Sequence, residues 1–393
     1  MASPVADSYG CASGGVIAGG RYYVSPFWRD MAQGWNEIVI SGAKPPGGIT
    51  AYSGMAVDVA RGELHLIGGG HFDYYGDEVW TLDYENRAQW VQDQLPYFTG
   101  YSMSYSGTVE SDAAYQYAKT RVDNVNFPGA IVEGAVPIRP ISRHTYKSVH
   151  WIESLHKMLV GGGSTWSGAA ERYWQAPGGV PDVWWNAPYD CWLYDATAKT
   201  WGYKGSSRLN PAYDTLGSVS CYHRLRNRVY QIGKDANSRI TMREWNPEAN
   251  TWTLHPGFAT GTTIGSATLC ADTKRDRILV IHRFSTNPVY LHAWYPETNT
   301  WEALTTTGAE PSSLAGDAQI CYSPKTDSLL LMRTAADGMQ VLDLTTMIWS
   351  SVNVPCPNLV QTEGRWFYDY RRGVALLVYR DIGTNIRVFS YKD

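Results

Sequence analysis

Two groups of polar residues carry the side-chain types that acid–base chemistry on an acidic sugar would need. His71 follows a Gly-Gly-Gly run, and Arg143, His144 and Tyr146 stand together later in the chain. A guanidinium can neutralise a carboxylate, while imidazole and phenol groups remove one proton and return another to a leaving oxygen. If the protein is an enzyme, we expect these four residues to be catalytic, with Tyr189 as a second candidate for the base.

A third group of residues offers aromatic faces. The Gly- and Pro-rich segment 164–190 holds five rings that we expect to bind a ligand: Trp166, Tyr173, Trp174, Trp184 and Trp185. Aromatic rings stack on the C–H faces of sugars, and they also anchor protein interfaces. The alternative is that the segment folds back and buries its own rings.

Other chemistry has little support in the sequence. No His or Cys cluster has the spacing of a metal site, and neither a GxSxG motif nor a phosphate-binding loop is present. The carboxylates that would hold Ca²⁺ are Asp73, Asp77 and Glu78, although acids in loops are usually only solvated. We therefore predict no cofactor other than this candidate calcium ion, and no other metal site.

Composition narrows the class of protein. The chain has 393 residues with 38 Gly, 17 Trp and 27 Tyr but only 18% charged residues, which is typical of an all-β fold with many turns. A formal net charge of −4 without a basic block argues against nucleic acid as a partner. No run of about 18 apolar residues exists, so no membrane insertion is expected.

The elements that must position these residues repeat along the chain. Six segments alternate apolar residues, turn through a polar stretch and return through a second apolar run: 54–70, 147–163, 218–233, 267–282, 318–333 and 365–380. Each predicts a β-hairpin. Further strands ending in a Trp follow the hairpins, and Trp201, Trp252, Trp301 and Trp349 are about 50 residues apart.

This period, with its Gly-rich hairpin ends and late Trp, resembles the kelch type of β-propeller. The resemblance implies an all-β propeller with six recognisable blades in a single domain, 1–393, and leaves open a seventh blade within 91–143. Cys221, Cys270 and Cys321 occupy equivalent positions of the repeat, so we interpret them as small buried strand residues.

The two ends of the chain complement each other. QGWNEIVISGAKP, residues 33–45, matches the repeat end NTWEALTTTGAEP, residues 299–311, but no front half precedes it. The last copy lacks its Trp strand, so residues 35–40 are predicted to supply that strand and close the ring. Residues 1–34 would then form a cap or partial blade, with 91–143 and 164–190 as loop insertions.

Two functions of different classes follow. One is a non-catalytic recognition or assembly propeller that contacts glycans or neighbouring subunits through aromatic rim loops. The other is a polysaccharide lyase cleaving a uronic-acid glycan by β-elimination, because propeller-type ulvan lyases are similar in their His, Tyr and Arg residues to His71, Arg143, His144 and Tyr146. The N-terminus carries no secretory signal, which favours a virion or lysis-released extracellular location, such as a phage tail, fibre or capsid surface.

Overall fold

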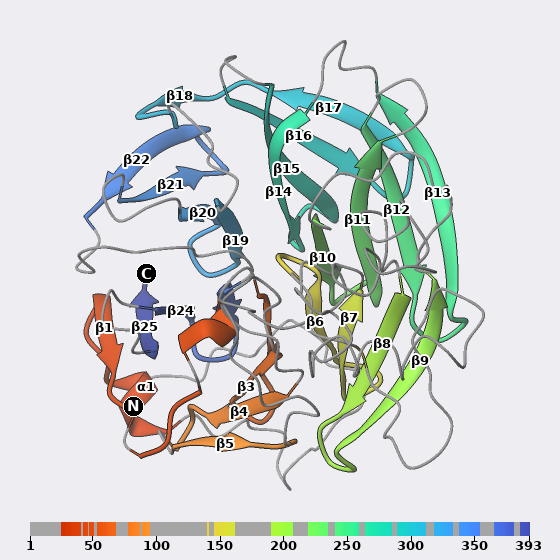
Figure 1. Cartoon of the computed structure of the whole chain (residues 1–393). Coiled ribbons are helices and arrows are strands. Elements are labelled where there is room, and N and C mark those ends of the chain that lie inside the picture. Colours follow the sequence, from red (N-terminus) through yellow and green to blue (C-terminus); the bar gives the residue numbers. More distant parts are fainter. Residues whose placement is uncertain are drawn as a thin grey trace, which may run out of the picture.

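The computed structural model shows an all-β ring of small sheets (Figure 1). It describes residues 25–40, 42–45, 47–50, 53–67, 78–86, 89–94, 140, 145–161, 190–206, 219–234, 240–258, 264–284, 289–311, 318–332, 338–353, 365–380 and 386–393. These residues form six antiparallel sheets arranged as a six-bladed β-propeller, which confirms the predicted fold class.

The blades follow the chain order. Blade 1 is β2 (Met55–Asp58), β3 (Glu63–Ile67), β4 (Val79–Asp83) and β5 (Trp90–Gln92), and blade 2 is β6 (Val149–Ile152), β7 (Lys157–Gly161), β8 (Asp190–Asp195) and β9 (Thr200–Ser206). Blade 3 is β10 (Val219–His223), β11 (Arg228–Lys234), β12 (Ile240–Asn246) and β13 (Thr251–Phe258). Blade 4 is β14 (Ile264–Asp272), β15 (Arg277–Phe284), β16 (Val289–Tyr295) and β17 (Thr300–Leu304).

Blades 5 and 6 carry strands from outside the simple repeat. Blade 5 is β19 (Gln319–Ser323), β20 (Ser328–Met332), β21 (Met339–Asp343) and β22 (Ile348–Val352), with β18 (Thr307–Gly308) added in parallel along β22. Blade 6 is β23 (Trp366–Asp369), β24 (Val374–Arg380) and β25 (Ile386–Lys392), completed by β1 (Gly34–Ile38). Trp35 pairs with Tyr391, so an N-terminal strand closes the ring as predicted.

The short hairpin turns share one backbone device. In every blade the last residue of the turn between the first two strands has a positive φ: Gly62, His156, Asn227, Asp276, Asp327 and Gly373. Asn, Asp and Gly tolerate this left-handed conformation better than other residues. The residue that ends the first strand caps the turn in several blades, as when Asp272 Oδ1 accepts from the amides of Lys274 and Arg275, each at 3.2 Å. The polar turn pattern of the sequence therefore has a local conformational cause.

Apolar side chains fill the spaces between blades. The cluster between blades 4 and 5 joins Cys270 and Leu279 to Ile320 and Leu331, and similar clusters lie between other neighbouring blades. Each sheet therefore buries a face against the next sheet, which a single sheet could not do. The described cysteines of the repeat are buried free thiols, as expected.

Ion pairs between arginine and carboxylate side chains, which we call latches, join neighbouring blades at their turns. Arg226 binds Asp276 of the next blade through Nε at 2.7 Å and Nη2 at 2.5 Å. Arg275 binds Asp327 in the same bidentate way, with both distances 2.7 Å. Where the ring closes, Arg372 Nε donates to Glu85 at 2.5 Å.

A short helix covers the closure between blades 6 and 1. Trp28 of α1 (Pro26–Arg29) is fully buried and packs edge-on against Tyr84. Lys392 Nζ donates to the carbonyls of Trp28, Arg29 and Met31. Among the described residues, no helix is long and apolar enough to cross a membrane.

Candidate functional site

Antiparallel topology gives the ring two different faces. The turn face carries the hairpin turns between the first two strands of each blade: 59–62, 153–156, 224–227, 273–276, 324–327 and 370–373. The loop face is the opposite face, where the second strand of each blade ends and its first strand begins. All connections from one blade to the next reach this loop face.

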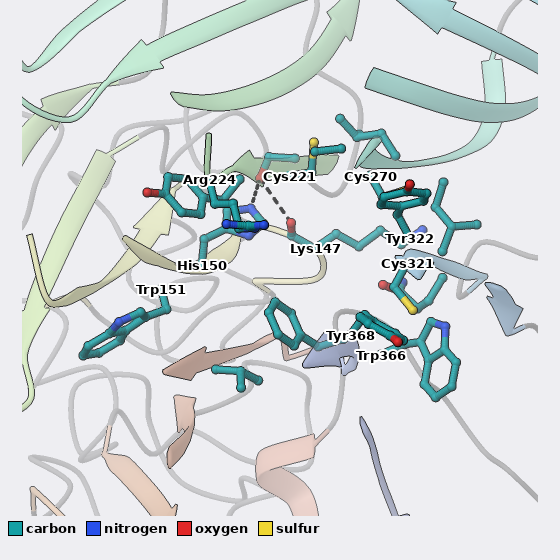
Figure 2. A pocket seen from close by; sticks show the side chains of 18 of the residues that line it. Lys147, His150, Trp151, Cys221, Arg224, Cys270, Cys321, Tyr322, Trp366 and Tyr368 are labelled. Atoms are coloured by element: carbon teal, nitrogen blue, oxygen red, sulfur yellow. Dashed lines mark hydrogen bonds between the residues drawn. The ribbon is translucent and has the colours of Figure 1, made fainter. Parts of the chain in front are cut away.

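An axial cavity runs between the two faces. Its volume is about 170 Å³, and residues from the first strands of all six blades line it. Figure 2 shows part of its wall, with His150, Cys221, Cys270 and Tyr322 around the opening.

Three side chains meet across the turn-face end of the cavity. Tyr370 of blade 6 donates its hydroxyl to Glu153 Oε1 of blade 2 at 3.0 Å, so this bond spans blade 1. The Arg224 guanidinium of blade 3 lies 4.2 Å from the centroid of the same ring. Burial raises the pKa of the Glu153 carboxyl, and the nearby Arg224 charge limits that rise. The three residues thus tie together blades that are not neighbours.

A lysine stands at the loop-face end. Lys147 is only 7% exposed, and its Nζ donates to the carbonyl of Ala267, two blades away, at 3.0 Å. Figure 2 shows its side chain crossing the cavity in the direction of Tyr322. A buried ammonium therefore faces the axis where the cavity meets the loop face.

The histidine in the cavity wall is neutral and held in place. His150 Nε2 lies 2.7 Å from Ser220 Oγ, which itself donates to the Lys147 carbonyl at 3.1 Å. Ser220 has its proton in that second bond, so the imidazole is the donor of the first. Burial lowers the pKa of His150 to about 4. This imidazole joins blades 2 and 3 and does not add positive charge to the cavity at neutral pH.

Most residues predicted to form the site lie outside the described part of the chain. This holds for the polar residues His71, Asp73, Asp77, Arg143, His144 and Tyr189, and for the aromatic residues Trp166, Tyr173, Trp174, Trp184 and Trp185. Their roles stay predictions.

Two predicted residues are described. Tyr146 is half-buried with φ of 43°, in the turn before β6, and the Gly54 amide donates to the preceding Thr145 Oγ1 at 2.7 Å. Glu78 is buried, and its Oε1 accepts from Trp80 Nε1 at 3.4 Å. Within the described ranges, no group of three or more His, Cys, Asp or Glu residues could hold a metal ion.

The strand ends that flank the predicted residues lie together. Ile67 and Val79 at the loop-face ends of β3 and β4 pack in one cluster with Val149 and Val160 of blade 2. His71 follows Ile67 closely in the chain, and Arg143 and His144 shortly precede Val149. Described residues close in sequence to both polar groups therefore belong to one cluster, between blades 1 and 2.

Sequence reasoning missed the residues that meet at the axis. Glu153, Arg224 and Tyr370 all occupy the first turn position of their hairpins, directly after the first strand. An alignment of the six hairpins brings them into one column with Val59, Thr273 and Pro324. Large polar residues in a column that repeats around a ring indicate convergence on its axis, and this signal was present in the sequence.

Comparison with known proteins supports the fold. No protein family and no curated protein sequence matches the chain. A solved structure of a protein of unknown function from Bacteroides thetaiotaomicron is similar over 91% of this chain and 76% of that one, with a TM-score of 0.51 and 11% identity.

Two further structures are more distant. An auxiliary nutrient binding protein from Bacteroides ovatus has a TM-score of 0.46 and 11% identity, over 87% of this chain and 69% of that one. TolB from Acinetobacter baumannii has a TM-score of 0.37 and 14% identity, over 51% of this chain and only 45% of that one. The argument for the fold therefore rests on the Bacteroides thetaiotaomicron structure, and at 11% identity that likeness concerns the fold alone.

Proposed function

We propose that the protein is a non-catalytic recognition or assembly propeller whose contact surface lies on the loop face of blades 1 and 2. The observation that carries this proposal is the shared junction of Ile67, Val79, Val149 and Val160. Insertion 164–190, with its aromatic residues, begins and ends in blade 2, and insertion 91–143 connects the same two blades. Departures from a repeat are where binding residues concentrate, because the repeat itself supplies the scaffold.

The partner classes we propose are glycans and neighbouring protein subunits. Aromatic rings such as Trp166, Trp174 and Trp184 suit both, since rings stack on sugars and anchor interfaces. The setting we propose is a phage virion, where a tail, fibre or capsid-surface protein must meet a host glycan or an adjacent subunit. We also assign the blades to the kelch type, on the spacing of Trp201, Trp252 and Trp301.

A glycan array tests this proposal with a matched control. In one variant, residues 166–186 are replaced one for one by Gly and Ser. In the control, residues 354–364, which connect β22 of blade 5 to β23 of blade 6 in the sequence, are replaced in the same way. We expect the natural chain and the control to be retained on the array or to associate with a neighbouring subunit. We expect the first variant to do neither. Unchanged binding by the first variant would place the contact surface elsewhere.

The second candidate function is a polysaccharide lyase, and the same junction favours it. Ile67 and Val149, which are close in sequence to His71 and to His144 and Tyr146, both belong to this cluster. In the reaction, Arg143 would neutralise the uronate carboxylate while one of His71, His144, Tyr146 and Tyr189 takes the C5 proton and another protonates the leaving oxygen. The product carries a carbon–carbon double bond conjugated to the carboxylate, which absorbs in the ultraviolet.

A direct assay decides between the two candidates. Incubation with uronate polysaccharides should leave the ultraviolet absorbance unchanged if the propeller only binds. A rise that disappears in the His144→Ala variant, with folding retained, would instead establish the lyase.

A further inference from the structure

Side chains that cross the axis close the turn-face end of the axial cavity. Blades 3 and 6 stand opposite each other in a ring of six, so a contact between them passes through the centre. The Arg224 guanidinium of blade 3 lies 4.2 Å from the ring centroid of Tyr370 in blade 6. The Tyr370 hydroxyl donates to Glu153 of blade 2 at 3.0 Å. These three side chains therefore block the centre of this end.

The closure is made by side chains rather than by strands. Glu153, Arg224 and Tyr370 each occupy the first position of a turn, and all three line the cavity. Each is half-buried, so it borders solvent as well as the cavity. Side chains at such positions change rotamer much faster than packed strands move. The end can therefore open without a change in the ring itself.

Two interactions hold the closed arrangement. One is the hydrogen bond from Tyr370 to the Glu153 carboxyl group, which is stronger when that group is charged. The other is the contact of the Arg224 cation with the face of the Tyr370 ring. Both interactions act on Tyr370, so this ring is the part that must move for the end to open.

We propose that Glu153, Arg224 and Tyr370 form a gate that controls entry to the axial cavity from the turn face. The hydrogen bond holds the Tyr370 ring across the axis, and the cavity opens when this bond breaks and the ring rotates away. The cavity has a volume of about 170 Å³, so passage is limited to small molecules. The gate lies on the face opposite the contact surface proposed above, so it does not depend on what that surface binds.

Three cysteines report whether the gate is open. Cys221, Cys270 and Cys321 are buried free thiols that line the cavity, and Figure 2 shows them on its wall. Cys191 is also a buried free thiol, but it lies in the cluster between blades 2 and 3 and outside the cavity wall. The rate at which a reagent modifies the first three thiols thus measures entry to the cavity, and Cys191 measures loosening of the blades.

Methyl methanethiolsulfonate, a small thiol reagent, tests the gate on the full chain, with each cysteine followed by peptide mass spectrometry. Tyr370→Phe keeps the ring and removes the hydrogen bond. If the reagent enters through the gate, the rate of modification is proportional to the open population. We expect the three cavity thiols to react at least about tenfold faster in this variant, the typical value of one hydrogen bond to a charged group. The rate at Cys191 should not change.

Tyr295→Phe is the matched control. Tyr295 donates its hydroxyl to Glu302 at 2.5 Å on the two outer strands of blade 4, away from the cavity wall. This variant should react like the natural chain. Equal rates at the cavity thiols in Tyr370→Phe and in the natural chain would overturn the gate. The same increase at Cys191, or in Tyr295→Phe, would also overturn it, because it would reflect a looser ring. If Tyr370→Phe does not fold, Glu153→Ala breaks the same bond from blade 2, and the same results decide.

Discussion

The turn face and the loop face of this propeller are built from the same strands but obey different rules. On the turn face, six short turns end in a left-handed residue, and charged side chains reach from one blade to the next. On the loop face, the connections vary greatly in length, and the two longest insertions belong to blades 1 and 2. The regular turn face therefore belongs to the scaffold, and the variable loop face is where we expect functional residues.

The strongest test of this contrast removes a latch of the turn face. Asp327 accepts both arms of Arg275 and also the Lys274 ammonium, and the Arg275 hydrogen bonds hold the pKa of Asp327 well below its usual value. Asp327→Ala removes these bonds, although Arg275 keeps Asp272 Oδ2 and the Leu344 carbonyl as acceptors, each at 3.2 Å. The substitution should lower the free energy of unfolding by about 1.5–3 kcal/mol, as for hydrogen bonds to charged groups. Urea unfolding measures this loss. Lys157→Met should change stability by less than about 0.5 kcal/mol, and an equally small effect of Asp327→Ala would show that the latch is not structural.

The buried imidazoles predict how the scaffold responds to acid. Burial lowers the pKa of His150 to about 4, whereas the unfolded value is about 6.5. Below about pH 6.5 the unfolded chain gains a proton on this imidazole that the folded chain does not bind, so stability is lost as the pH falls from about 6.5 to about 4.

The size of this effect is at most about 1.4 kcal/mol per pH unit, the value for one proton bound by the unfolded chain and not by the folded chain. His150→Gln should make stability less dependent on pH between 7 and 5 in urea titrations. The control is His156→Asn, because His156 is exposed and Asn accepts its φ of 52°. The same pH dependence in His150→Gln as in the natural chain would rule His150 out as its source.

A smaller effect is expected for substitutions in the turns between the third and fourth strands of the blades. Asn299 has φ of 53°, and its Oδ1 accepts from Trp294 Nε1 at 3.3 Å. Asn299→Ala loses that bond and strains the left-handed position, for a cost of about 1–2 kcal/mol. Asn299→Gly loses the bond only and should cost less. Asn250, paired with Trp245 at 3.3 Å, should behave in the same way under urea; if Ala and Gly were equivalent at both positions, the left-handed backbone would not be the cause.

The smallest effect on stability is expected on the loop face. Replacing 166–186 by Gly and Ser should change the free energy of unfolding by less than about 0.5 kcal/mol, as surface changes usually do. Thermal unfolding followed by circular dichroism would show this. A large loss would mean that the insertion is part of the core, against the contrast between the two faces.

The sequence predicts the scaffold better than the site, for physical reasons. Alternating apolar residues and polar turns repeat in six copies, so a strand assignment that is uncertain in one copy is supported by the others. The match of Trp35 to the repeat end located the closing strand β1. The axial cavity depends instead on single residues, Lys147, Glu153 and Tyr370, brought together by ring closure across distant parts of the chain. The repeat period alone does not predict contacts between residues that each occur in a single blade. Such residues become visible only when the six copies are aligned.

The most direct test of the account is the glycan array with the natural chain, the chain with 166–186 replaced, and the chain with 354–364 replaced, alongside their unfolding curves. We predict equal stability for all three, and binding lost only when 166–186 is replaced. Binding that survives this replacement, or is lost equally in the 354–364 control, would contradict a contact surface on the loop face of blades 1 and 2.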